Sequence, residues 1–343
     1  DARTAVQGGG SCLGVMGSAG VRIDSGDGVG VFAIWDERGD YGSAIADFGD
    51  GPRAAGRRAA MAAVDRAGRA GEAPDLFWIT ATPGCEEVII AGIDEVTGGS
   101  TPILGGSAAD NDVSGAWRIF ADGPALGEGV AVTALFPSVP MACGFQSGYA
   151  PTGESGFASR VEGRRILAID GRPARAVYQS WASPTLPPSD GSRDVPVLSS
   201  STWAPLGREI GRVAGIPFHL IVHPAMLSGN GGIDVFATVP EGERLHAMAG
   251  SADSLATRAA RLAYATLGDD DLKTGVSGAL VVFCGGSMLA MKAEMGHVVD
   301  GLNEVLGDVP FMGIFTFGEQ GPTLAGDNVH GNLMISCLVF GKP

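Results

Sequence analysis

A pattern of secondary-structure elements occurs twice in this chain, and it restricts the fold more than any other feature of the sequence. Residues 75–136 and 278–340 each read as a strand, a helix, a second strand, a Gly-rich polar loop and a third strand. A helix is expected before each copy, at 53–70 and at 252–267, and residues 11–35 read as the second half of one further copy. We therefore predict an α/β fold of two domains built on a repeated strand-helix-strand-loop-strand unit, with mixed sheets flanked by helices.

The start of the chain departs from this repeat. Residues 1–7 (DARTAVQ) are predicted to begin a helix, and the string GGGS at 8–11 stands where an opening strand and helix are expected. We interpret GGGS either as natural sequence or as a flexible join left by a deletion. The length of 343 residues is sufficient for two cores. We place the domains at 1–145, with its first strand and helix missing, and at 146–343.

Composition and charge restrict the possible partners. A hydrophobic content of 45% with 18% charged residues is typical of a packed globular protein. The net charge of −15 argues against nucleic acid and anionic membrane as partners, because both require a basic surface. No uncharged apolar run reaches membrane-spanning length. The five cysteines form no CxxC pair, which indicates reduced thiols, so we expect a cytoplasmic protein.

The Gly-rich loop of the C-terminal copy, residues 318–332, is the first candidate binding site. Gly318 allows backbone N–H groups to approach a carboxylate or phosphate, and Glu319 is suited to accept a hydrogen bond from an ammonium group. Three polar residues alternate along the start of the next strand and therefore share one face: Asn328, His330 and Asn332. Such alternation is also typical of the solvated side of a strand, and both interpretations stay open.

The corresponding loop of the N-terminal copy, residues 105–111 (GGSAADN), is the second candidate. Its small residues permit close approach, and its candidate ligand contacts are Gly106, Ser107, Asp110 and Asn111. The alternative is a tight turn capped by Asp and Asn. If the two copies pack about a pseudo-twofold axis, both loops line one crevice at the ends of their strands, where open α/β sheets bind ligands. Cys284 is then expected at the floor of that crevice.

Cys284 also raises the alternative of an enzyme. It ends a buried strand just before Gly285, at a strand-to-helix turn where a nucleophile or an anion site is found. A Cys- or Glu-dependent hydrolase or transferase would use Cys284, Glu319 and His330. A small cysteine is equally typical of an apolar core. We therefore assign no catalytic residue and favour binding over catalysis.

The remaining histidines predict no metal site. His219 and His223 are four residues apart, and on a strand this spacing is too long for one ion; no third ligand is apparent. His246 and His297 are interpreted as structural. A haem requires one axial His or Cys in an apolar pocket, and the sequence alone designates none. No cofactor is therefore predicted, and haem is kept as the alternative.

Five stretches of the chain carry a family resemblance: IDGRPARAVYQ (169–179), VPEGERLHAM (239–248), GIFTFGEQGP (313–322), NVHGNLMISCLVF (328–340) and ILGGSAADN (103–111). Through the first four, the C-terminal half resembles the FIST C domain. Through the last, the N-terminal half is similar to the FIST N domain. The chain departs from the family in two places: the turn CLGVMGSAG (12–20) lacks the acidic residue that usually follows its Gly, and no Arg follows Cys284.

The resemblance implies a sensory module inside the cell. FIST proteins are regarded as domains that bind small ligands, and amino-acid-like ligands have been proposed for them. They are fused to or encoded with signalling partners, so a histidine kinase or another signalling protein is the implied partner. Some members resemble haem-binding nitric-oxide sensors, which gives the haem alternative its basis. The resemblance thus favours binding of a small polar ligand in a crevice between the two domains.

Overall fold

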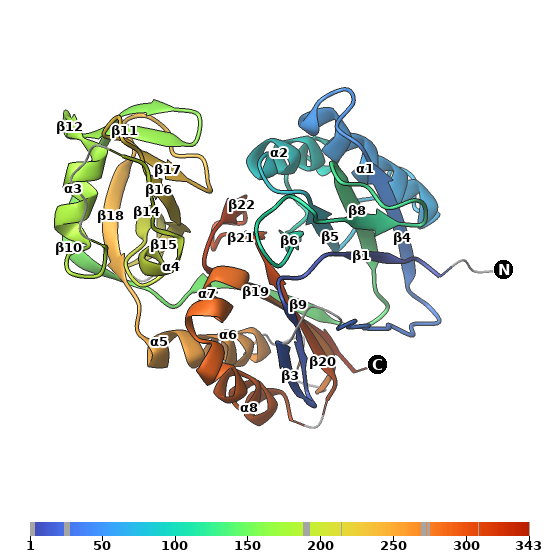
Figure 1. Cartoon of the computed structure of the whole chain (residues 1–343). Helices are drawn as coiled ribbons and strands as arrows, with labels where there is room; N and C mark the ends of the chain where they lie inside the picture. The colour runs from blue at the N-terminus through green and yellow to red at the C-terminus, as the bar shows by residue number, and fades with distance from the viewer. Residues whose placement is uncertain are drawn as a thin grey trace.

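The two copies of the repeat form two six-stranded sheets that pack face to face, and a third sheet lies beside them (Figure 1). The computed structural model describes residues 4–23, 28–187, 193–213, 215–268, 272, 275–307 and 309–342. The predicted α/β class, with mixed sheets flanked by helices and a repeated unit, is confirmed. None of the helices in these ranges is both long and apolar enough to cross a membrane.

The first sheet contains the N-terminal copy of the repeat. Its parallel strands β5 and β6 are connected through a helix, as a parallel pair requires, and β8 and β4 are added antiparallel. Across the sheet the order is β22 (Asn328–Gly331), β21 (Glu319–Pro322), β6 (Ile103–Ser107), β5 (Leu76–Ala81), β8 (Val130–Phe136) and β4 (Asp40–Ala46). Its helices are α1 (Pro52–Arg66) and α2 (Glu86–Thr97), and the left-handed Gly98 ends α2 as predicted.

The second sheet repeats this order with the C-terminal copy. Strands β19 and β20 form the parallel pair, and β23 and β9 follow antiparallel. Across the sheet the order is β3 (Gly20–Ile23), β2 (Gly14–Gly17), β20 (Phe311–Thr316), β19 (Val276–Cys284), β23 (Met334–Gly341) and β9 (Met141–Ser147). Its helices are α5 (Ala252–Ala256), α6 (Arg258–Leu267), α7 (Gly285–Ala290) and α8 (Met295–Leu306), with a 3-10 turn at Lys292–Glu294.

One helical expectation in this half is refined. The helix expected at 252–267 is divided into α5 and α6 at Thr257. The Thr257 hydroxyl donates to the Asp253 carbonyl, a local bond that competes with the regular helix ladder, and Ser251 and Ser254 form a capping box that defines α5 as a separate turn.

Each sheet is completed by a hairpin from the other half of the chain. The chain leaves the second sheet after β20, pairs β21 with β6 in the first sheet, and returns to the second sheet as β23. In the same manner β2–β3, near the N-terminus, pairs with β20. Residues 28–35, the end of the segment read as half of a further copy, have no regular structure. The two halves are therefore joined by main-chain hydrogen bonds in both directions.

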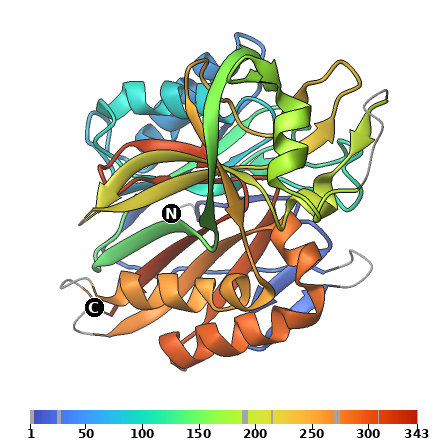
Figure 2. The same ribbon diagram turned by 90° about the vertical axis from the view of Figure 1, so that its left-hand side faces the viewer.

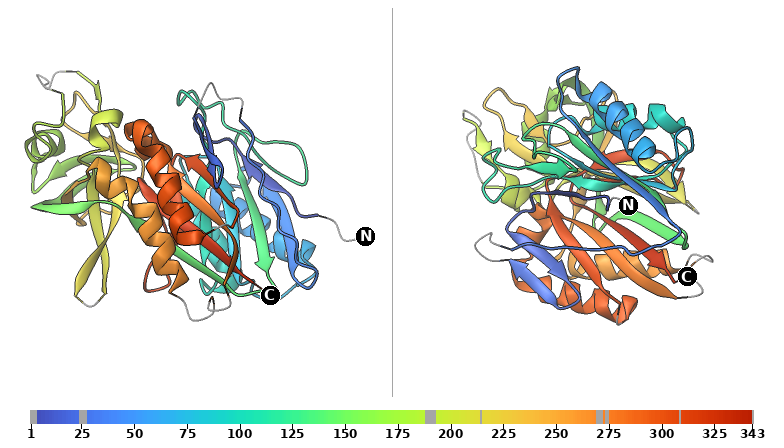
Figure 3. Two further views of the ribbon diagram at one scale, coloured as in Figure 1. Left: turned by 90° about the horizontal axis from the view of Figure 1, so that it is seen from below. Right: turned by 90° about the vertical axis from the view of Figure 1, so that its right-hand side faces the viewer.

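An apolar layer lies between the two sheets. Leu76, Leu104 and Leu135 of the first sheet pack with Leu338 and Phe340 of the second. Helices α1 and α2 cover the outer face of the first sheet, and α6 and α8 cover the outer face of the second. The right-hand view of Figure 3 shows the resulting order of helices, sheet, sheet and helices. The facing sheets fix the position of every polar residue that enters this layer from a strand end.

The glycines near the N-terminus are packed residues. Strand β1 (Gln7–Gly9) pairs with β7 (Ile119–Ala121), so the predicted helix at the start is wrong at Gln7. A Cβ atom on Gly8 would lie 2.3 Å from the ring of Phe120, and one on Gly10 would lie 2.3 Å from the Ala109 carbonyl oxygen. The interpretation of this string as a flexible join is therefore wrong for residues 8–10, because only glycine permits these contacts.

The third sheet is formed by residues 150–249 and faces the viewer in Figure 2. Its strands run in the order β13 (Val195–Pro196), β16 (Pro224–Leu227), β17 (Ile233–Val235), β11 (Arg165–Ile169), β10 (Ala150–Glu162), β18 (Arg244–Ala249), β14 (Leu206–Val213) and β15 (Ile216–Val222), with β12 (Arg172–Pro173) paired to β11. Helices α3 (Ala174–Trp181) and α4 (Leu198–Ser201) belong to it, and Tyr178 of α3 is fully buried in its core.

Candidate functional site

The pairing of β6 with β21 brings the two predicted loops together at the centre of the molecule (Figure 1). Glu319 pairs with Gly106, Gln320 pairs with Gly105, and the Ser107 N–H donates to the Gly318 carbonyl at 2.8 Å. Backbone hydrogen bonds between β6 and β21 therefore fill the place where a crevice was expected. Gly105 also permits β6 to lie close to β5, because a Cβ on Gly105 would lie 2.0 Å from the Ile79 carbonyl oxygen.

A chain of buried polar side chains crosses this junction. Gln320 Nε2 lies 3.1 Å from His330 Nδ1 and donates to Ser107 Oγ at 3.3 Å. Ser107 Oγ in turn donates to Glu86 Oε1 at 2.8 Å. All four residues are at most 2% exposed. The chain therefore connects β22, β21 and β6 to the first residue of α2 inside the protein.

The chain continues from Glu86 to the surface. Arg164 Nη2 lies 2.6 Å from both Glu86 Oε2 and Glu87 Oε2, and the Thr238 N–H donates to Glu87 Oε1 at 2.6 Å. Burial disfavours the charged form of Glu87, yet any positive charge on neighbouring His330, the Arg164 guanidinium and the Thr238 N–H lower its pKa to about 2. The Arg164 and Glu87 side chains are 21% and 31% exposed. The outer end of the chain thus belongs to the β10–β11 hairpin and the 236–243 loop of the third sheet.

Two buried atoms in this row of polar side chains have no hydrogen-bond partner among the described residues: His330 Nε2 and Gln320 Oε1. Because an amide nitrogen only donates, Gln320 Nε2 makes His330 Nδ1 an acceptor, and the neutral ring then carries its hydrogen on Nε2. Glu86 Oε2 is 4.0 Å from that Nε2, beyond hydrogen-bond distance. The site therefore contains one unpaired donor and one unpaired acceptor, and each costs about 1–3 kcal/mol while unpaired.

Gly318 sets the position of the histidine. Its φ is +147°, and a Cβ there would lie 2.4 Å from His330 Cε1. Gly318 does allow a close approach, as the sequence predicts, but the group that approaches is the His330 ring. The ring is thereby held against β21, with its Nε2 toward Glu86.

Four other predicted contacts are used by the protein's own chain. Asp110 accepts hydrogen bonds from the N–H groups of a turn at residues 113–116, and Asn111 accepts one from the Leu13 N–H at 2.7 Å. Asn328 Oδ1 accepts from the Ile103 N–H at 2.8 Å. Asn332 Oδ1 accepts from the His223 N–H at 3.2 Å. These side chains hold turns and strand ends in place, as the alternative of Asp- and Asn-capped turns describes.

Cys284 and Glu319 form a separate buried pair. Glu319 is 0% exposed, accepts from Thr316 Oγ1 at 2.7 Å and from the Met334 N–H at 2.9 Å, and is hydrogen-bonded by the Cys284 thiol. Burial raises the pKa of Glu319 to about 8, and burial followed by the Glu319 charge raises the pKa of Cys284 well above its usual value. Among the described residues no hydrogen bond joins this pair to His330. The thiol is therefore protonated at neutral pH, whereas a cysteine nucleophile requires a thiolate.

Haem binding, the alternative that the family resemblance implies, stays a prediction. An axial ligand faces an apolar pocket. In the described part of the chain, each imidazole has a polar neighbour: Glu86 for His330, the Leu198 carbonyl for His223, Glu294 for His297, and Glu209 for the pair His219 and His246. We derive no chemistry through a haem.

Sequence reasoning missed Glu86, Gln320 and Arg164. Two of them have a sequence signal that could have identified them. Glu86 stands in the first turn of a predicted helix, and Gln320 follows Glu319 in the Gly-rich loop. The register of β21 against β22, which places Gln320 opposite His330, is a tertiary result. No sequence signal marks Arg164, because it reaches Glu86 from a hairpin 78 residues away.

Comparison with known families divides the chain in two. The FIST N domain matches residues 3–172 and the FIST C domain matches residues 174–322. A search of curated proteins finds no match. The polar chain joins the two matched segments, since Glu86, Ser107 and Arg164 lie in the first and Gln320 in the second. The boundary that we placed between residues 145 and 146 stays a prediction.

Proposed function

The chain belongs to the FIST family, whose domains are sensory, and from this premise we propose that it binds a small polar, amino-acid-like ligand where its two domains meet. The binding groups are His330, Gln320 and Glu86. Binding is relayed to a signalling partner in the cytoplasm. The cytoplasmic assignment is supported by four cysteines that form no disulfide, Cys12, Cys85, Cys284 and Cys337.

The observation that carries this proposal is the pair of unpartnered buried atoms. A ligand carboxylate accepts from His330 Nε2–H, and a ligand ammonium donates to Gln320 Oε1 and to the Glu86 carboxylate. An amino acid carries both groups on one carbon atom. A ligand that lacks either group leaves one buried protein atom unpaired, and this supports discrimination between otherwise similar molecules.

The Arg164 hairpin supports a route for the signal. The guanidinium of Arg164 is the charged partner of Glu86. A ligand ammonium at Glu86 competes with Arg164, which then remains paired with Glu87 alone. The β10–β11 hairpin and the 236–243 loop, which also holds Glu87, respond to this change. The third sheet is therefore the element that reports binding to the partner.

Calorimetric titration with a panel of amino acids, amines and carboxylates tests the proposal. We expect at least one amino-acid-like compound to bind, and Glu86→Gln to weaken its binding at least about tenfold, because the carboxylate charge is lost. Glu95→Gln in the same helix is the matched control, since Glu95 is a half-exposed partner of Arg53, and it is expected to bind as the wild type does. Equal binding by the Glu86→Gln variant contradicts the site. Mass spectrometry of the denatured protein as purified supplies candidates for the panel.

The partner, a histidine kinase or another signalling protein, is supported by family membership alone. Autophosphorylation of a candidate kinase is measured with and without the protein, in the presence and absence of the bound compound. A change that depends on the compound supports the relay. A change of equal size with the Glu86→Gln variant and the compound opposes it.

A further inference from the structure

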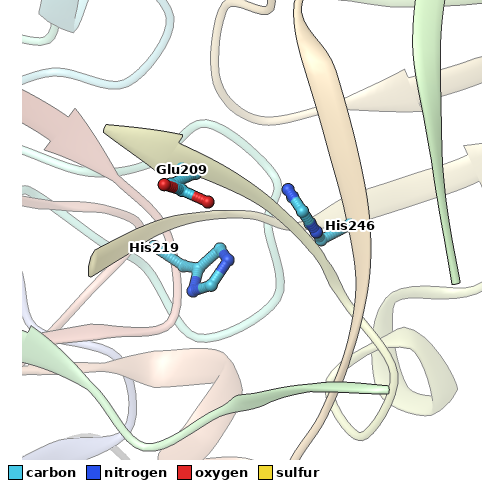
Figure 4. A group of neighbouring side chains, drawn as sticks. All are labelled: Glu209, His219 and His246. Atoms are coloured by element: carbon cyan, nitrogen blue, oxygen red, sulfur yellow. The ribbon is translucent and has the colours of Figure 1, made fainter. Parts of the chain in front are cut away.

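A second polar cluster lies in the third sheet, and it consists of other residues than the row of polar side chains described above. His219 on β15 pairs directly with Glu209 on β14, and His246 on β18 pairs with Gly207 on β14. Because residues 207 and 209 point to the same side of β14, all three side chains gather on one face of the sheet, as Figure 4 shows. Their ligand atoms all lie within 4.8 Å of one another.

Gly207 permits the two imidazoles to meet. It lies on β14 between the strands that carry the histidines, and it has no side chain to separate them. A Cβ there would come within 2.8 Å of Met248 and 3.5 Å of the His219 Cβ. The ring centroids are consequently 5.0 Å apart at an interplanar angle of 73°. This close approach across an intervening strand requires a glycine at this position.

Each of the two imidazoles has one nitrogen atom without a hydrogen bond. The Nε2 atoms of His219 and His246 are both buried and have no hydrogen-bond partner among the described residues. His219 is 8% exposed. Neutral imidazoles with free nitrogen atoms beside a carboxylate are the form in which these residues bind a metal ion.

We propose that Glu209, His219 and His246 form a binding site for a divalent transition metal ion, with Zn²⁺ as the expected occupant. Two imidazoles and one carboxylate are a ligand set that Zn²⁺ accepts, with a fourth position left for water. Bond lengths of about 2.0–2.2 Å place tetrahedral ligand atoms closer together than 4.8 Å, so small side-chain rotations complete the site. No metal site was predicted from the sequence because His219 was compared with His223. His223 follows the end of β15, and its Nε2 lies within hydrogen-bond distance of the Leu198 carbonyl.

Positive charge near the site opposes the metal ion. Arg212 donates to both oxygens of Glu209, and Arg244, on the strand that carries His246, bonds to Ser155. A bound ion shares Glu209 with Arg212 or displaces it. Arg212 is therefore predicted to weaken the site, and Arg212→Ala to strengthen it. The Glu209 side chain is 27% exposed, so the ion reaches the site from solvent.

The experiment is a Zn²⁺ titration of chelator-treated full-length protein by calorimetry, with Co²⁺ as a spectroscopic replacement. The expected result is one ion per chain, with a visible Co²⁺ absorption typical of low-coordinate nitrogen and oxygen ligands. His246→Ala and His219→Ala are each expected to lower affinity at least about tenfold, and Arg212→Ala to raise it. His297→Ala is the matched control, because His297 is exposed and pairs only with Glu294.

The proposal is overturned if Zn²⁺ does not bind, or if His219→Ala and His246→Ala bind it as the wild type does. Far-ultraviolet circular dichroism of each variant identifies any that fails to fold. For such a variant Glu209→Gln, on the more exposed third ligand, replaces it and carries the same expectation of weaker binding.

Discussion

Two hairpins occupy the same place in the two central sheets, yet one is polar and the other apolar. Hairpin β21–β22 adds Glu319 and Gln320 to the edge of β6, opposite Gly106 and Gly105. Hairpin β2–β3 adds Val15 and Met16 to the edge of β20. The topology is therefore common to both sheets, but of the two hairpins the polar one contributes residues, Gln320 and His330, to the candidate binding site.

The two hairpins are equally buried but differ in the hydrogen bonds that their residues require. Met16 is 2% exposed and belongs to the apolar core beneath α6 and α8. Glu319 and Gln320 are equally buried, but each has named polar partners. A buried polar residue is tolerated where its hydrogen bonds are made, so the polar hairpin depends on its neighbours far more than the apolar one does.

The largest effect is expected from placing a charge in the apolar hairpin. Met16→Glu buries a carboxylate among apolar side chains without hydrogen-bond donors, and we expect it to destabilise the protein by about 4 kcal/mol. Urea denaturation measures the free energy of unfolding. A loss below about 1 kcal/mol would show that this edge is as receptive to polar groups as β6, which removes the distinction between the hairpins.

The next effect is a pH dependence from Glu319. Its folded-state pKa of about 8 lies above its usual value of 4.5, so the stability that its protonated form contributes is fully present below about pH 4.5 and is lost as the pH rises through about 8. Compared with the wild type, Glu319→Gln is expected to keep its stability over this range, a difference of roughly 2–4 kcal/mol at the alkaline end. Thermal melts in buffers of increasing pH measure it. Parallel curves for the two proteins contradict a raised pKa.

A smaller effect is expected at the glycines of the two hairpins. Gly318→Ala is predicted to cost about 2–3 kcal/mol, because the new Cβ meets the His330 ring and the backbone has a positive φ. Gly20→Ala in the β2–β3 hairpin also has a positive φ, but its Cβ meets nothing within 4 Å, so about 1 kcal/mol is expected. Guanidinium denaturation of both variants gives the difference. Equal losses would show that the contact with His330 is unimportant.

The sequence predicted the repeat because each copy buries its own strands and helix, and that pattern is local. It did not predict that hairpins 14–23 and 319–331 complete opposite sheets, because strand order depends on pairing between distant segments. The glycines at 8–10 were misread for the same reason, since their contacts with Phe120 and Ala109 are long-range.

The candidate site was predictable in part. Ser107, Gly318 and His330 do meet, as the paired Gly-rich loops indicated. The roles of Asp110 and Asn328 differ from the expectation because their side chains are taken up by nearby backbone groups. Glu86 and Arg164 meet through the contact between α2 and a hairpin of the third sheet, so their joint role has no local signal in the sequence.

The central claim is that His330 Nε2 binds a ligand at the polar hairpin, and nitrogen NMR of ¹⁵N-histidine-labelled protein tests it most directly. The His330→Gln variant assigns its signals, and exposed His297 is the internal reference. Without ligand, we predict that Nδ1 of His330 accepts from Gln320 and that the ring hydrogen is on Nε2, and on addition of the binding compound a shift of the His330 Nε2 signal while His297 is unchanged. A compound that binds with the His330 signals unmoved would contradict the account.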